Sequence, residues 1–147
     1  MSERSVRALG LDLGGRRIGV AVSDRSGTVA SPLDVILRTG SRQRDHDRIA
    51  RLVADEDAEV IVVGLPLSMD GQLGPAAKAA LAEVRVLGSV VGVPVLTHDE
   101  RLTTVTAERS LREAGLDGRA RRKVVDKVAA AVMLQAWLDS PARWEPT

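Results

Sequence analysis

The chain has 147 residues, a formal net charge of +1 and no cysteine. A chain of this length forms one domain that can bury a substantial core, and the lack of cysteine excludes a disulfide framework, a thiolate metal site and a cysteine nucleophile. No segment approaches the ~20 consecutive apolar residues that a membrane span requires, so we expect a soluble, cytoplasmic protein.

The composition also bears on nucleic-acid binding. Nearly all the positive charge is arginine, with lysine only at Lys78, Lys123 and Lys127, and arginine favours bidentate contacts with phosphate or carboxylate groups. Solvated surface arginine explains the same composition equally well. The aromatic residues are Trp137 and Trp144, so single-stranded bases have no row of rings to stack on. Any nucleic acid is therefore expected to be held mainly through its backbone.

The first predicted elements form a hairpin over residues 7–24. Two runs rich in Leu, Ile and Val flank Gly14 and Gly15, and paired glycines between apolar runs indicate a turn because glycine accepts positive φ angles. Asp12 interrupts the first run just before this turn. A carboxylate inside a sheet needs a compensating partner, although an aspartate beside two glycines also commonly stabilises a turn. Asp12 is therefore a candidate site residue whose role depends on its neighbours.

Strands and helices follow this hairpin in an order that indicates the fold class. Amphipathic spacing and turn residues predict a turn at 24–27, a third strand over 28–37 with an irregular edge at Pro32, and a helix over 41–57. A buried parallel strand over 59–64, a long loop over 65–75 and a helix over 76–88 come next. We then expect a fifth strand reached through 90–97, a helix over 103–114, a basic loop over 117–123 and a final helix over 123–139. This order predicts an α/β fold in which a five-stranded mixed sheet carries helices on both faces. We expect this domain over residues 1–140 and a disordered tail over residues 141–147.

Carboxylates from three separated elements form the candidate chemical site. Asp12 lies in the first strand, Asp99 and Glu100 lie at the end of the fifth, and Asp126 lies in the apolar last helix, where alone it also suits the positive end of a helix dipole. Acids gathered in this way repel one another unless cations separate them. Oxygen ligands suit Mg²⁺ or Mn²⁺, and a pair of such ions activates water and stabilises the leaving oxygen in phosphodiester cleavage.

Four segments of this sequence together resemble the bacterial YqgF (RuvX) family. They are residues 11–23, 63–71, 99–104 and 125–130, which read LDLGGRRIGVAVS, VGLPLSMDG, DERLTT and VDKVAA. The resemblance runs from about Val6 to Asp139 and implies an RNase H-like fold. Members of that family are described as Holliday junction resolvases or as nucleases that mature the 5′ end of pre-16S rRNA.

The resemblance also implies roles for individual residues. Asp12, Glu100 and Asp126 match the family's metal ligands and are our candidate catalytic residues, with two Mg²⁺ or Mn²⁺ ions as the expected cofactors. Asp99 is the alternative to Glu100: because adjacent strand residues face opposite ways, we expect only one of the two to reach the metal. Ser68 departs from the family, which often has Asn at this position, and leaves the hydrogen bonding of the 65–75 loop open.

Basic side chains are expected to hold the rest of a polyanionic substrate. The candidates are Arg16, Arg17, Arg101, Arg119, Arg121, Arg122 and Lys123. The last four cluster at the start of the predicted last helix, where the helix dipole disfavours cations. Their position therefore suggests a phosphate partner, although a solvated loop would explain it too. The expected partners are structured RNA such as pre-16S rRNA, branched DNA and ribosomal assembly intermediates, bound by a monomer or a homodimer.

Three functions stay open beside the processing of pre-16S rRNA. They are cleavage of four-way DNA junctions, RNA binding without catalysis in ribosome assembly, and small-molecule phosphorylation. The last arises because residues 12–15 also resemble the first phosphate-binding hairpin of sugar and acetate kinases. Those enzymes close a second domain over ATP, for which this chain is too short, and the sequence has neither a P-loop nor a GxGxxG motif.

Overall fold

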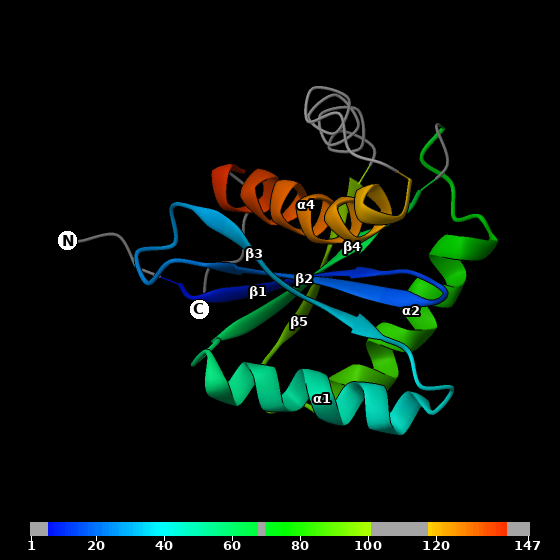
Figure 1. The fold of residues 1–147 in the computed structure, drawn as a ribbon, viewed down its shortest axis with the longest axis horizontal. Coiled ribbons are helices and arrows are strands. Elements are labelled where there is room, and N and C mark those ends of the chain that lie inside the picture. The colour runs from blue at the N-terminus through cyan, green and yellow to red at the C-terminus, as the bar shows by residue number, and fades with distance from the viewer. Residues whose placement is uncertain (1–5, 68–69, 101–117, 141–147) are drawn as a thin grey trace.

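The computed structural model describes residues 6–67, 70–100 and 118–140, with the side chains of residues 118–127 excepted. Its elements are β1 (Ala8–Leu13), β2 (Arg17–Ser23), β3 (Ala30–Leu37), α1 (Arg42–Asp55), β4 (Val60–Leu65), α2 (Pro75–Gly88), β5 (Val95–Asp99) and α4 (Gly118–Asp139). The strands form one sheet in the order β3-β2-β1-β4-β5 (Figure 1). The first three strands are antiparallel, and β4 and β5 run parallel to β1. The predicted five-stranded mixed sheet is confirmed.

Some predicted features lie outside the described residues. They are Ser68, Arg101, the helix over 103–114 and the tail over 141–147. For Arg119, Arg121, Arg122, Lys123 and Asp126, the backbone is described but the side chain is not.

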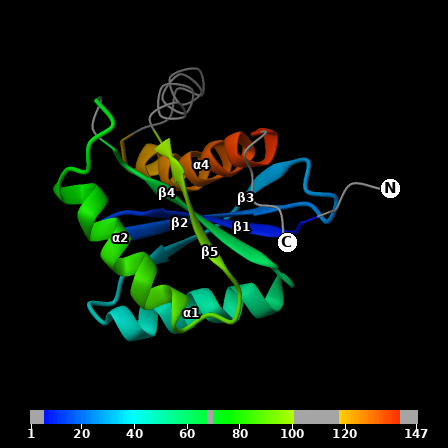
Figure 2. The same ribbon diagram turned by 180° about the vertical axis from the view of Figure 1, so that it is seen from behind.

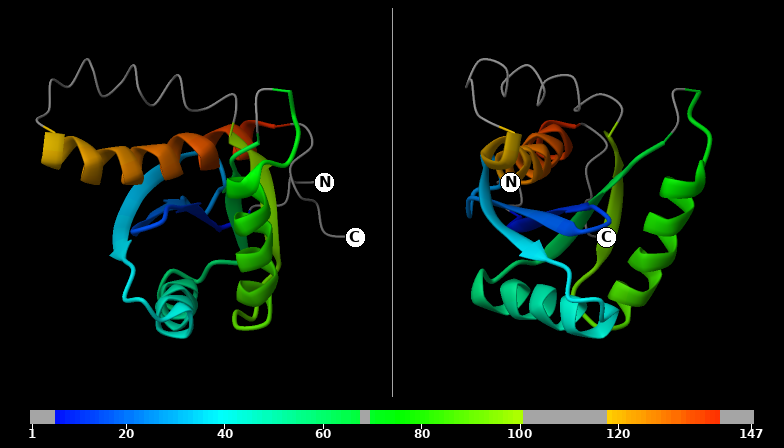
Figure 3. Two further views of the ribbon diagram at one scale, coloured as in Figure 1. Left: turned by 90° about the vertical axis from the view of Figure 1, so that its right-hand side faces the viewer. Right: turned by 45° about the vertical axis from the view of Figure 1, so that its right-hand side comes forward.

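Helices cover both faces of the sheet, as predicted. α1 and α2 lie against one face, and α4 lies against the other (Figures 1 and 3). Side chains alternate along each strand, so Leu9 and Leu11 of β1 enter the core beneath α1 and α2, whereas Ala8 enters the core beneath α4. β3 and β5 form the two edges, and Figure 2 shows β5 beside α2. Within the described residues, no helix combines the length and the apolar character needed to cross a membrane.

The last helix begins earlier than predicted. α4 already begins at Gly118, so the predicted basic loop over 117–123 is wrong from Gly118 onward. The run of Arg, Ala and Lys that follows is favourable for helix and contains no further glycine or proline. α4 packs closely on β1: a Cβ atom at Gly10 would lie 2.9 Å from the Cβ of Leu134. A glycine is therefore needed where the helix crosses this strand.

Short polar contacts fix the connections between elements. The Asp24 carboxylate accepts hydrogen bonds from the backbone N–H groups of Thr28 and Val29, at 2.8 and 3.1 Å, and these bonds lower the pKa of Asp24. Ser41 caps α1 by accepting a hydrogen bond from the Arg44 backbone N–H. The Gln135 side chain of α4 accepts from the backbone N–H of Ala30 at 2.8 Å. The last helix is thereby tied to the edge strand β3.

Candidate active site

Asp12 lies at the carboxyl end of β1, on the face covered by α4. Its partner in β2 is Gly19, and Leu11 pairs with Val63 in β4, so the next position along β4 is Gly64. Neither sheet neighbour carries a side chain, which leaves space above the strands for the Asp12 carboxyl and a second group. The sequence therefore leaves room for a second carboxyl group beside this aspartate.

Glu100 is the second group. β5 ends at Asp99, and Leu96 packs into the core beneath α4. Because side chains alternate along a strand, Glu100 shares the face of Leu96, whereas Asp99 belongs to the opposite face. The carboxyl groups of Asp12 and Glu100 form a hydrogen bond with each other. The structure thus brings Glu100 to Asp12, and Asp99 lies close enough to add to the rise in the pKa of Glu100.

Gly64 sets the distance between these elements. A Cβ atom at this position would lie 2.7 Å from both the Cγ and the Cδ of Glu100. That distance is well inside van der Waals contact, so the Glu100 side chain occupies the volume that any larger residue would need. Gly64 is therefore part of the site, although it bears no functional group.

Burial and like charge raise the pKa values of the pair. Burial is the largest cause of the rise for Glu100, whose pKa reaches about 8 with further contributions from the neighbouring Asp12 and Asp99. Burial also raises the pKa of Asp12, and the hydrogen bond with Glu100 partly opposes that rise. A carboxyl pair in which one pKa reaches about 8 shares a proton near neutral pH. Within the described residues, Asp12 forms no ion pair with a lysine, arginine or histidine.

The third predicted carboxylate, Asp126, belongs to α4. The carbonyl oxygen of Ala130 would lie 3.4 Å from a Cβ atom at Gly10, and residue 126 is one helical turn before Ala130. α4 runs in the opposite direction to β1 (Figure 1), so this turn lies toward the end of β1 that carries Asp12. Among the side chains described, no group of three or more His, Asp or Glu residues is arranged to hold a metal ion.

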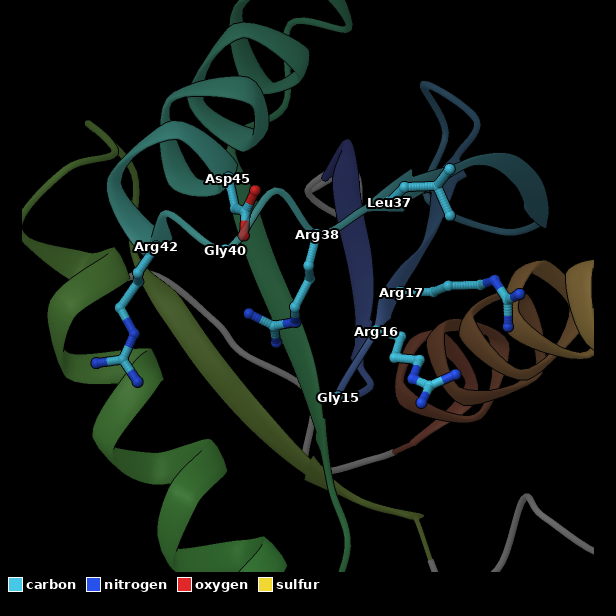
Figure 4. Close-up of a pocket in the computed structure, with 8 residues that line it drawn as sticks. All are labelled: Gly15, Arg16, Arg17, Leu37, Arg38, Gly40, Arg42 and Asp45. Atoms are coloured by element: carbon cyan, nitrogen blue, oxygen red, sulfur yellow. The ribbon is translucent and has the colours of Figure 1, made fainter.

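Basic residues surround the turn between β1 and β2. Arg16 is exposed in this turn and Arg17, the first residue of β2, is half-buried. They line a groove with Arg38, Arg42 and Asp45, the basic groove (Figure 4). Arg38 and Arg42 were not predicted as site residues, because the chain places them after β3 and at the start of α1, apart from the hairpin. Of the other predicted basic residues, Arg119, Arg121, Arg122 and Lys123 lie in the first two turns of α4.

A buried ionic network, which no sequence pattern predicted, holds the hairpin in place. The Nε of Arg38 donates to the Gly14 carbonyl oxygen at 2.7 Å. Its two terminal nitrogens donate to the Glu83 carboxylate, each at 2.9 Å. One of these carboxylate oxygens, Oε2, also lies 2.8 Å from the Nε2 of His46, which is fully buried. The turn that follows Asp12 is thus anchored to both α1 and α2.

Comparison with known proteins places this chain in a family. The model described as "RuvX: Holliday junction resolvase" matches residues 6–140. A protein of Pelotomaculum thermopropionicum named "Putative pre-16S rRNA nuclease" is 46% identical over 138 residues, which cover 94% of this chain and 90% of the relative. A protein of Mycobacterium sp. (strain KMS) with the same name is 45% identical, over 90% of this chain and 79% of the relative.

Solved structures show the same fold. The structure "T. thermophilus RuvC in complex with Holliday junction substrate" matches with a TM-score of 0.55 at 20% identity, over 91% of this chain and 96% of RuvC. A second structure of Thermus thermophilus RuvC matches with a TM-score of 0.50 at 17% identity, over 86% of this chain and 92% of RuvC. The predicted RNase H-like fold is confirmed. Because the family model spans residues 6–140, the chain belongs to the RuvX family.

Proposed function

We propose that this protein is a divalent-metal-dependent nuclease that processes the 5′ end of pre-16S rRNA during ribosome biogenesis in the cytoplasm. The observation that carries the proposal is the hydrogen-bonded pair of half-buried carboxyl groups, Asp12 and Glu100, at the carboxyl ends of β1 and β5. Membership of the RuvX family supports phosphodiester cleavage. The names of the 45–46% identical relatives favour the RNA substrate.

The donor set suits Mg²⁺ or Mn²⁺. Carboxylate oxygens are the ligands that these hard cations prefer. A pair that shares a proton because two negative charges repel each other also gains most from a cation, which replaces the proton. Asp12 and Glu100 would hold two ions together with Asp126 from α4. When bound, such ions supply an activated water and neutralise the leaving oxygen of a phosphodiester.

The protein's own residues position the reaction. Gly19 and Gly64 leave the space in which the two carboxyl groups meet. Arg38 holds the Gly14 carbonyl and so fixes the turn that follows Asp12. Arginines beside this turn would bind the substrate backbone, because guanidinium groups match the geometry of phosphate oxygens. The chain has only two aromatic residues on which bases could stack. This composition fits recognition of a structured RNA by its backbone and 2′-hydroxyl groups.

The test is direct competition between two substrates. An RNA carrying the 5′ end of pre-16S rRNA and a four-way DNA junction are offered together at equal salt, with Mg²⁺ or Mn²⁺, and cleavage of each is scored. We expect processing of the RNA, and no processing by the Asp12→Asn variant, which removes a ligand charge without changing its volume.

Other outcomes identify the competing functions. Symmetric nicking of the junction with no processing of the RNA would contradict the RNA assignment and favour a resolvase, which would be expected to act as a homodimer because it makes paired cuts. RNA binding without cleavage in either metal would favour a non-catalytic assembly factor. Full activity of the Asp12→Asn variant would show that the reaction occurs elsewhere.

A further inference from the structure

The basic groove contains more positive charge than the fold itself uses. Arg38 is engaged by Glu83 and by the Gly14 carbonyl. Asp45, the acid in the groove lining, is buried and accepts hydrogen bonds from the backbone N–H and the hydroxyl of Thr39. Arg38 and Asp45 therefore have partners within the fold. The other arginines of the groove are Arg16, Arg17 and Arg42.

Arg16, Arg17 and Arg42 have no carboxylate partner within the part of the chain that the structure describes. The Nε of Arg17 is buried and has no hydrogen-bond acceptor there. A buried donor without an acceptor is uncommon, and a phosphate oxygen in the groove would supply the acceptor. By contrast, Arg7 and Arg48, away from the groove, each pair with an acid, at 2.9 and 3.2 Å.

The groove adjoins the candidate active site through the turn between β1 and β2. Asp12 pairs with Gly19 across the hairpin, and the Gly14 N–H donates to the Arg17 carbonyl at 2.9 Å. Arg16 and Arg17 extend from this turn toward α4, whereas Arg38 and Arg42 extend toward α2 (Figure 4). Guanidinium groups therefore stand on both sides of the turn that follows the site aspartate.

We propose that the basic groove binds backbone phosphates of the substrate strand beside the scissile phosphodiester, with Arg16, Arg17 and Arg42 as the phosphate contacts and Arg38 as a positioning residue. This inference rests on the proposed nuclease function for the identity of the strand. Phosphate is favoured because arginine offers paired N–H donors to its oxygens. Gly15 and Gly40 also line the groove, and an added Cβ at either would meet no atom within 4 Å, so a strand has open space to approach.

The first experiment measures binding. The Arg16→Ala/Arg42→Ala double variant and the wild type are titrated with a fluorescent RNA carrying the pre-16S 5′ end, in EDTA, over a series of salt concentrations. Each lost phosphate contact reduces the slope of log K against log salt by about 0.7 to 0.9, so we expect the double variant to lose roughly 1.5 from the slope. Its thermal unfolding should match that of the wild type, because both side chains are exposed.

The matched control removes two other exposed arginines. Arg44 and Arg51 lie on α1 in a second groove, next to Asp47 and Asp55, and Arg44→Ala/Arg51→Ala should leave the slope unchanged. An unchanged slope in the Arg16/Arg42 variant, an equal loss in the control, or no RNA binding by the wild type would each overturn the proposal.

A second experiment separates the groove from the cleavage chemistry. With Mn²⁺, the Arg16→Ala/Arg42→Ala variant should show a raised KM and a nearly unchanged kcat on the long RNA. On an RNA shortened until it no longer carries the phosphates that reach the groove, variant and wild type should have similar KM values. An equal loss on both lengths would overturn the groove assignment. If the wild type does not cleave at all, the nuclease function fails, while the salt series still decides whether the groove binds phosphate.

Discussion

Two carboxylate clusters, one buried and one half-buried, lie on opposite faces of the sheet, and they differ in how their negative charge is compensated. Glu83, on α2, is paired with Arg38 and with His46 of α1. Burial raises the pKa of Glu83, but the hydrogen bonds from Arg38 and His46 outweigh it and the net pKa is lowered. Glu100, on the α4 face, meets the carboxyl group of Asp12, and burial and the neighbouring acids raise its pKa to about 8.

The difference separates a structural cluster from the candidate functional one. At Glu83 the chain itself supplies the Arg38 guanidinium and a hydrogen-bond partner in His46, so the charge is satisfied in the protein alone. At Asp12 and Glu100 the groups that shift the pKa values are burial and other acids, so the pair gains from a cation that comes from solution. Arg38 connects the two clusters, because the guanidinium that neutralises Glu83 also holds the turn after Asp12.

The largest effect should come from neutralising Glu100. Glu100→Gln should lower cleavage by more than about 100-fold, because even indirect supports of a metal ligand are worth about 10 to 100-fold. Asp99→Asn makes the same charge change one residue earlier, on the opposite face of β5, and should cost less than about tenfold. Steady-state cleavage in Mn²⁺ measures both variants. A larger loss in Asp99→Asn than in Glu100→Gln would refute the facing of β5 on which the site depends.

Breaking the structural cluster should destabilise the fold. Glu83→Gln leaves Arg38 and His46 without their anion, and we expect a loss of roughly 2 to 3 kcal/mol in the free energy of unfolding, read from urea denaturation. Since the folded pKa of Glu83 lies below its ordinary value of 4.5, its contribution is present above that pH and disappears as the pH falls through the folded pKa.

The control for Glu83 is an exposed pair. Asp34 lies 3.2 Å from Arg48, with 39% and 56% of the two side chains exposed, and Asp34→Asn should change stability by less than about 0.5 kcal/mol. Equal effects of Glu83→Gln and Asp34→Asn would remove the distinction between a buried network and a surface pair.

Gly64→Ala tests the space in which the carboxyl groups meet. The added methyl group would displace the flexible Glu100 side chain, so we expect activity to fall about tenfold, or roughly 1.4 kcal/mol, with little loss of stability. Gly88→Ala, at a position where an added Cβ meets nothing within 4 Å, should retain full activity. A fully active Gly64→Ala variant would show that Glu100 is not needed where the structure places it.

The smallest effect concerns stability without metal. Because the folded pKa of Glu100, about 8, exceeds its ordinary value of 4.5, the stability of the wild type should fall as the pH rises between these values. In EDTA at pH 9, Glu100→Gln should therefore be more stable than the wild type, by about 1 kcal/mol after allowance for residual solvent exposure. The gain should disappear near pH 4. Equal stability of the two proteins at both pH values would contradict the raised pKa.

The sequence indicated the functional cluster better than the structural one. Asp12 stands out because it interrupts an apolar run, and strand alternation already limited the choice to one of Asp99 and Glu100. The Glu83 cluster has no such signal, because Arg38 and Glu83 are 45 residues apart and His46 and Glu83 are 37 apart. Their pairing depends on how α1 and α2 pack, which local patterns do not encode. The start of α4 was missed because Arg and Lys suit a solvated loop as well as a helix.

Calorimetric titration of the metal-free protein with Mn²⁺ shows directly whether Asp12 and Glu100 form an acid pair that is completed by a cation. Titrations at pH 7 in two buffers with different ionisation enthalpies report how many protons are released on binding. We expect the wild type and Asp34→Asn to bind Mn²⁺ with proton release, and Asp12→Asn and Glu100→Gln to lose most of the affinity and the released proton. Undiminished Mn²⁺ binding by Asp12→Asn and Glu100→Gln would contradict this expectation.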